Sequence, residues 1–200
     1  MKTIISLFAL MSLILGGCAT PEMLTRKGAD APSAQTLAGR WTMLEDIDSA
    51  RRDLDRAINA TNDVNEKRET RRISSAQEKG KRTPRPAVGG LVHVFLKNGR
   101  TLKITQTKTA LFISFNRSIV EEYHFGEARN ISVGAVTAQR VSGWEGEQYV
   151  IETLDQERMK LTERYHLLDN GTRLRRQIVF RSKKGEEVIN FQTFERDSDE

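Results

Sequence analysis

The sequence has little cysteine, few aromatic residues and no long apolar run. Cys18 is the only cysteine, so the chain cannot form an internal disulfide. The longest apolar stretch covers residues 4–15, whereas a membrane-spanning helix needs about 20 apolar residues, so a permanent transmembrane segment is excluded. Aromatic residues make up 6% of the chain and do not alternate with basic ones as a single-strand nucleic-acid platform requires. We therefore expect no nucleic-acid partner.

The sequence also lacks the common catalytic signatures. Neither Gly-x-Ser-x-Gly nor His-Glu-x-x-His is present. Three histidines, His93, His124 and His166, fall in three different expected strands. Three imidazoles that met inside a barrel would form a zinc site, but nothing in their spacing requires them to meet. We predict no enzyme, no metal and no cofactor.

The N-terminus has the pattern of a secretory signal: Lys2, a short apolar run, and Gly16 and Gly17 before Cys18. Leu15-Gly16-Gly17-Cys18 resembles the lipobox of bacterial lipoproteins. The resemblance implies cleavage before Cys18 and stable membrane anchoring by several acyl chains on that cysteine. By the same resemblance, Ala19 points to the periplasmic face of the outer membrane. The alternative is an ordinary secretory signal that ends in a chance cysteine.

The remaining chain divides into a short tether and one domain. Residues 1–17 are the expected signal peptide, residues 18–36 a lipid-anchored tether, and residues 37–200 a single domain. The net charge of +5 permits attraction to anionic lipids or polymers without specifying a partner.

Residues 45–79 are expected to be helical, because apolar residues recur there at three-to-four spacing among many charges. Residues 80–90, with Gly80, Pro84 and Pro86, are expected to form a loop. The charged face is either solvated or contacts an anionic surface; the arginines concerned are Arg51, Arg52, Arg56, Arg68, Arg71 and Arg72.

Residues 91–196 are expected to form an antiparallel up-and-down meander, because alternation of period two is punctuated by turn signals. Asn98-Gly99 predicts a hairpin. The expected strands are 91–96, 101–106, 111–115, 119–125, 131–138, 139–144, 148–154, 159–168, 173–181 and 187–194. The fold class is therefore mainly β, and closure into a barrel would remove exposed edges.

Leu37-Ala38-Gly39-Arg40-Trp41 resembles the opening of the calycin group, the lipocalins and their relatives. The resemblance implies a barrel in which Trp41 plugs one end and Arg196 packs across it. Trp144 is expected either in the core or at the mouth of a pocket, so Trp41 and Trp144 are the candidate ligand contacts. The whole chain resembles a set of proteobacterial lipoproteins with an Arg-rich helix and a β-meander.

These features favour a non-enzymatic envelope lipoprotein whose β domain binds a small apolar ligand or another envelope protein. A structural or assembly lipoprotein that docks on anionic envelope polymers through the basic helix is the first alternative. An enzyme of unrecognised type is the second. A ligand binder requires an interior that bulky side chains do not fill.

Overall fold

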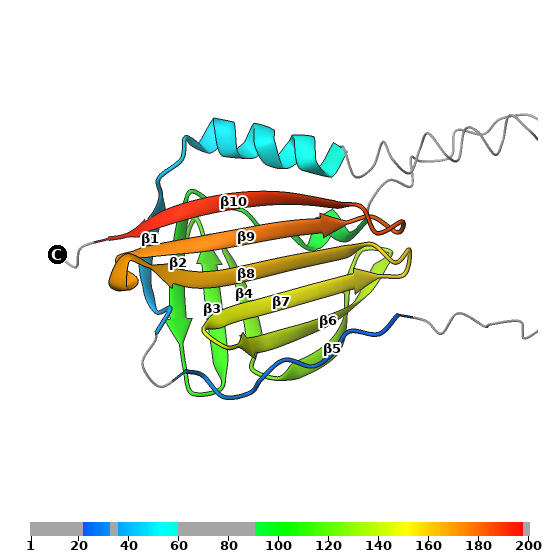
Figure 1. Cartoon of the computed structure of the whole chain (residues 1–200), viewed down its shortest axis with the longest axis horizontal. Helices are drawn as coiled ribbons and strands as arrows, with labels where there is room; N and C mark the ends of the chain where they lie inside the picture. The colour runs from blue at the N-terminus through cyan, green and yellow to red at the C-terminus, as the bar shows by residue number, and fades with distance from the viewer. Residues whose placement is uncertain (1–21, 33–35, 60–90, 198–200) are drawn as a thin grey trace, which may run out of the picture.

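The computed structural model describes residues 22–32, 36–59 and 91–197, which form a nearly closed antiparallel barrel (Figure 1). The strand order is β4-β3-β2-β1-β10-β9-β8-β7-β6-β5. The predicted fold class, a mainly β antiparallel up-and-down meander, is confirmed, and the sheet curls into a barrel that is nearly closed. The strands are β1 (Gly39–Met43), β2 (Thr101–Gln106), β3 (Ala110–Phe115), β4 (Ile119–His124), β5 (Glu127–Val133), β6 (Val136–Glu145), β7 (Gln148–Asp155), β8 (Lys160–Leu168), β9 (Arg173–Arg181) and β10 (Glu187–Arg196).

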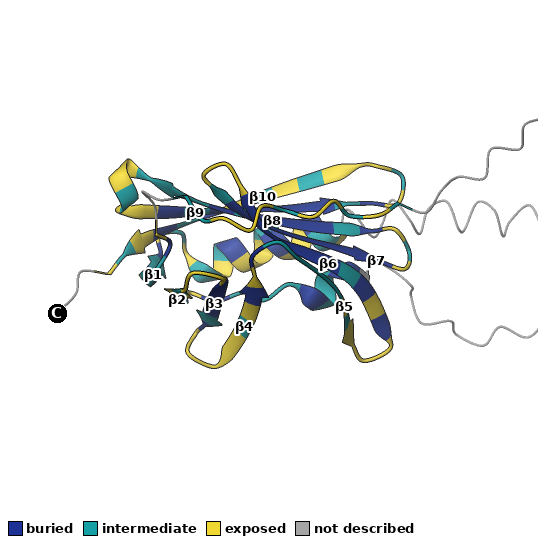
Figure 2. Cartoon of the chain, turned by 90° about the horizontal axis from the view of Figure 1, so that it is seen from below, coloured by how far each residue is buried: buried dark blue, intermediate teal, exposed yellow. Residues whose placement is uncertain are grey.

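The barrel has one gap, between β4 and β5, which follow each other in the chain without pairing. Figure 2 shows the β3–β4 and β5–β6 hairpins extending apart from this point. At one end of the gap, two side-chain hydrogen bonds join β6 and β7 to β4. The Ser142 hydroxyl donates to the His124 carbonyl at 2.8 Å, and the Tyr149 hydroxyl donates to the Tyr123 carbonyl at 3.2 Å.

The described part of the charged segment, residues 47–59, is helical and lies against the barrel (Figure 1). Its apolar stripe is buried at Ala50, Leu54 and Ala57. The helical prediction is confirmed there, because three-to-four spacing places these side chains on one helix face. The rest of the predicted helix, 60–79, and the predicted loop, 80–90, lie outside the described residues.

Two predicted strands are wrong. Leu91–Phe95 is a 3-10 helix, and Asn98-Gly99 does not form the expected hairpin because no strand precedes it. The Asn98 side chain instead accepts a hydrogen bond from Gln192 at 3.0 Å. Residues 131–138 are not one strand: Gly134, with φ of 59°, turns the chain between β5 and β6. The structure also adds β1, which the sequence analysis did not predict as a strand.

The buried residues form two apolar clusters. Figure 2 shows buried stretches on most of the strands. One cluster surrounds Trp41, Tyr149 and Phe194. The other lies beneath the helix and includes Leu54, Phe95, Val92, Met159, Leu161 and Phe180. Burial of these large side chains supplies the main driving force for closing the barrel.

Trp41 plugs one end of the barrel, as the calycin resemblance implies. It is fully buried, and its indole N–H donates to the Leu37 carbonyl at 3.1 Å. The Arg196 guanidinium lies 4.1 Å from the centroid of the Trp41 ring and donates to the carbonyls of Ala38 and Gly171. Arg196 therefore ties the final strand to the first one.

Candidate functional site

A layer of polar side chains crosses the barrel between the two apolar clusters. We call it the polar layer. Five of its members are buried, and Glu121 is half-buried. Its members are Glu121 on β4, Arg140 on β6, Thr153 on β7, Glu163 on β8, Arg176 on β9 and Gln192 on β10. Buried charges are costly unless they are paired, so each charge in this layer needs a physical explanation.

Arg176 is a fully satisfied structural cation. Its guanidinium contacts the Glu163 carboxylate through two nitrogens, at 3.0 and 2.5 Å. It also donates to Gln192 at 3.2 Å and to the Lys97 carbonyl at 2.7 Å. Burial lowers the pKa of Arg176, but its interactions with neighbouring groups, including the ion pair and hydrogen bond with Glu163, outweigh burial and raise it overall. Arg176 therefore stays charged and joins the segment before β2 to β8 and β10.

Arg140 is also buried but is held by fewer groups. Only 5% of it is exposed. Its Nε donates to the Thr153 hydroxyl at 3.1 Å, and its terminal nitrogen lies 3.5 Å from the Glu121 carboxylate, a distance too long for a strong hydrogen bond. The guanidinium lies between the rings of Phe95 and Tyr123, 5.7 and 5.5 Å from their centroids. Among the described residues, Arg140 thus keeps unused donor capacity within an aromatic surrounding.

The tyrosines around the polar layer are held neutral. Burial, together with the nearby Glu163 carboxylate, raises the pKa of Tyr123 far above its usual value. Burial likewise raises the pKa of Tyr165, whose hydroxyl donates to Glu163 at 2.9 Å. These groups can therefore serve as hydrogen-bond donors but not as anions or bases.

The sequence analysis missed the polar layer although the alternation contains its signal. Arg176 is in phase with Leu174 and Ile178, and Glu163 is in phase with Leu161 and Tyr165. Residues two apart on a strand share a face, so charged residues in phase with buried ones must also point inward. Arg140 shows the same pattern between Ala138 and Ser142 on β6, where all three residues are buried.

The two candidate ligand contacts, Trp41 and Trp144, are both buried. Trp144 packs on Phe125 and Tyr149, with ring centroids 5.8 and 5.3 Å away. Its indole N–H is buried without a hydrogen-bond partner among the residues that the structure describes. Contact of either tryptophan with a ligand stays a prediction.

The other candidate residues are dispersed. Arg51, Arg52 and Arg56 are exposed on the helix, and Arg56 pairs with Asp53. Their contact with an anionic surface stays a prediction. Cys18, Arg68, Arg71 and Arg72 lie outside the described residues.

The histidines lie apart in the fold. His93 is in the 3-10 helix, His124 pairs with Glu122 on the outside of β4, and His166 lies on the outside of β8. Burial, together with the neighbouring charge of Arg175, lowers the pKa of His166. Within 22–32, 36–59 and 91–197, no cluster of three metal-ligating side chains occurs, and no helix is long and apolar enough to cross a membrane.

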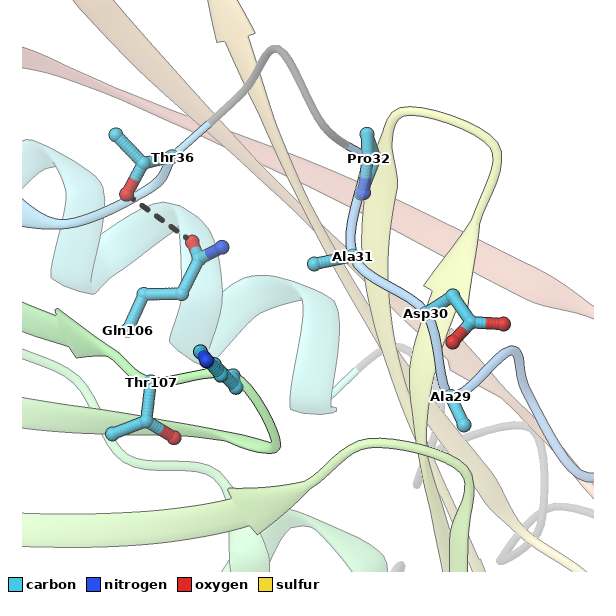
Figure 3. Close-up of a pocket in the computed structure, with 8 residues that line it drawn as sticks. Ala29, Asp30, Ala31, Pro32, Thr36, Gln106 and Thr107 are labelled. Atoms are coloured by element: carbon cyan, nitrogen blue, oxygen red, sulfur yellow. Dashed lines mark hydrogen bonds between the residues drawn. The ribbon is translucent and has the colours of Figure 1, made fainter.

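An open depression of about 740 Å³ lies outside the barrel, between residues 29–32 and the β2–β3 turn (Figure 3). Asp30 and Lys108 are the charged residues of its lining. On one side of the depression, the Thr36 hydroxyl donates to the Gln106 side-chain oxygen, 3.5 Å away. Because the depression is wide open and borders residues 33–35, which are not described, we do not assign it a ligand.

Comparison with known proteins gives similarity of fold only. No family model matches the chain, and no curated protein matches it. A solved structure of human cRBP IV is 16% identical, with a TM-score of 0.47, and the match covers 82% of this chain and 99% of that one. A secretory abundant heat soluble protein from Ramazzottius varieornatus is 12% identical, with a TM-score of 0.38, over 48% and 70% of the two chains. The fluorescent protein UnaG (N57A mutant) is 14% identical, with a TM-score of 0.36, over 50% and 72%.

Proposed function

We propose that this protein is a lipid-anchored, non-enzymatic binding protein that holds a small amphipathic molecule at the open side of its barrel, between β4 and β5. In this proposal Cys18 carries the lipid and the barrel lies on the periplasmic face of the bacterial outer membrane. The ligand's acidic head group contacts Arg140, and its apolar body lies along the gap between β4 and β5.

The observation that carries this proposal is the contrast between the two buried arginines. Arg176 has close partners on several sides, whereas Arg140 has one hydrogen bond and one longer ion pair among the described residues. Buried ion pairs contribute little net stability compared with apolar packing, so stability alone does not account for a buried arginine with so few partners. A carboxylate fits such a cation well, because a guanidinium binds it through two parallel hydrogen bonds.

The test uses a fluorescent acid and its neutral counterpart. Dansyl-undecanoic acid and its methyl ester are titrated into the full mature chain. We expect the acid to bind more tightly, because a hydrogen bond to a charged group contributes about 1.5–3 kcal/mol, which corresponds to roughly 10- to 150-fold in affinity. Equal affinities for acid and ester would contradict the head-group assignment.

Variants locate the site. Arg140→Gln is expected to lower the affinity for the acid and leave the affinity for the ester unchanged. Arg117→Gln, at an exposed position in the β3–β4 turn, is the matched control and should change neither. Thermal unfolding of both variants checks that they remain folded. Acid binding by Arg140→Gln at the original affinity would place the head group elsewhere.

A further inference from the structure

Residues 22–32, part of the segment predicted to be a tether, lie along the outside of the barrel; we call them the strap (Figure 1). Gly28 and Trp144 exchange two main-chain hydrogen bonds, each 2.9 Å long. Lys27 contacts the carboxylates of Glu145 and Glu152 at 2.5 and 2.9 Å. The strap is thus fixed to the barrel along its length.

The strap ends at a defined point on the barrel. The Glu22 carboxylate receives hydrogen bonds of 2.6 and 2.7 Å from Arg181, the last residue of β9. Residues 19–22 span at most about 14 Å when fully extended. A lipid on Cys18 would therefore enter the bilayer within roughly that distance of Glu22. Only surfaces near Arg181 can then face the membrane.

The outer face of β8, β9 and β10 begins at Arg181 and has an unusual composition. Register places Thr162, Val179 and Ile189 in one row, and the next row contains Arg164, Gln177 and Phe191. Ile189 and Phe191 are 50% and 53% exposed, which is high for large apolar side chains. We call the side chains of Arg164, Arg175, Ile189 and Phe191 the docking patch.

The docking patch is positively charged. The outward positions of these strands contain five cations and two carboxylates, Glu187 and Glu195. Three of these cations have carboxylate partners: Lys160 pairs with Glu152, Arg173 with Asp169 and Arg181 with Glu22. Arg164 and Arg175 have none among the described residues, and Arg175 lies 5.9 Å from the centre of the Phe191 ring.

We propose that the docking patch lies on the membrane, with Ile189 and Phe191 in the interfacial region and Arg164 and Arg175 against anionic lipid head groups. The proposal rests on the lipid anchor at Cys18 proposed above. The anchor's reach selects this side of the barrel, and the combination of exposed apolar and cationic side chains matches an anionic bilayer surface. The strap thereby sets the orientation of the barrel, since a free tether would allow any face to approach the lipid.

The first test measures which face contacts lipid in the acylated protein. Cys18 is the only native cysteine and its sulfur is blocked by lipid, so an introduced cysteine gives a single labelling position. Gln177→Cys marks the docking patch, and Val120→Cys, 63% exposed on β4, is the matched control. In phosphatidylcholine–phosphatidylglycerol vesicles with nitroxide-labelled lipid, we expect strong quenching of a fluorophore at position 177 and weak quenching at position 120. Equal quenching, or the reverse order, overturns the proposal.

The second test separates the docking patch from the anchor. The mature Cys18→Ser chain lacks the lipid, and its sedimentation with the same vesicles is compared with variants. Each of Arg164→Gln and Arg175→Gln should weaken binding by roughly fivefold, since a cation near an anionic surface contributes about 1 kcal/mol. Lys108→Gln and Arg117→Gln, exposed cations at the β2–β3 and β3–β4 turns, should have little effect.

The outcomes are distinguishable. If the Cys18→Ser chain does not bind the vesicles, or if all four substitutions weaken binding equally, the docking patch is not a membrane site. An unlipidated mass for the natural protein would instead refute the proposed anchor, and the vesicle comparison would still report on the patch.

Discussion

Neutralising Glu163 should strongly destabilise the barrel, because this carboxylate is the counter-ion of a fully buried arginine. Glu163 and Arg176 are 2% and 0% exposed, and their closest atoms are 2.5 Å apart. Glu163→Gln keeps the shape of the side chain and one acceptor oxygen but leaves the Arg176 charge buried without a counter-charge. Removing one member of a buried pair typically costs 3–5 kcal/mol. For a domain of this size that corresponds to a fall in Tm of roughly 6–20 °C.

Urea unfolding of the full mature chain, monitored by circular dichroism, measures this loss. Glu157→Gln removes an exposed carboxylate that lies 3.8 Å from Lys183 and is the matched control, with an expected cost below about 1 kcal/mol. The double variant Glu163→Leu, Arg176→Met should lose less stability than Glu163→Gln, since it leaves no unpaired charge. If Glu163→Gln unfolded at the same urea concentration as the Glu157→Gln control, the pair would not be desolvated as argued.

Three further predictions concern the strap and the end of the barrel. Burial raises the pKa of Glu152, but Lys27 and Lys160 outweigh burial and lower it below 4.5. The stabilisation of the strap by Glu152 is therefore present above pH 4.5 and is lost as the pH falls through the folded-state pKa. Amide exchange at Gly28 should then accelerate at a higher pH than exchange within β9, and simultaneous acceleration would contradict this. Gly143→Ala should release the strap, because φ is +154° and the new Cβ would clash with the Gly28 carbonyl oxygen. Unchanged proteolysis within 22–32 would disprove this. Arg196→Lys should lower the free energy of unfolding in urea by roughly 1–3 kcal/mol, because lysine cannot cover the Trp41 ring and donate to two carbonyls at once. An unchanged free energy of unfolding would mean that the stacking is not stabilising.

Local sequence patterns determined most of the strands. Alternation in β8 and β9 separates Leu161 and Tyr165 from Lys160 and Arg164, and a two-residue period defines a strand with one buried face. The Gly39-x-Trp41 opening also predicted the plugged end, including Arg196 over the ring. These features are local or come from a single short motif, so they can be recognised before the chain is folded.

The tertiary structure determined which partners the buried charged side chains have. Alternation places Arg140 and Arg176 on the inward faces of their strands, but only the folded barrel brings Glu121 and Glu163 from other strands to meet them. The same holds for Asn98, whose side chain bonds to Gln192, 94 positions away, in place of forming the expected hairpin. The partner of a buried polar group is set by strand register and barrel closure, which are long-range properties, whereas alternation within a strand records only which face is covered.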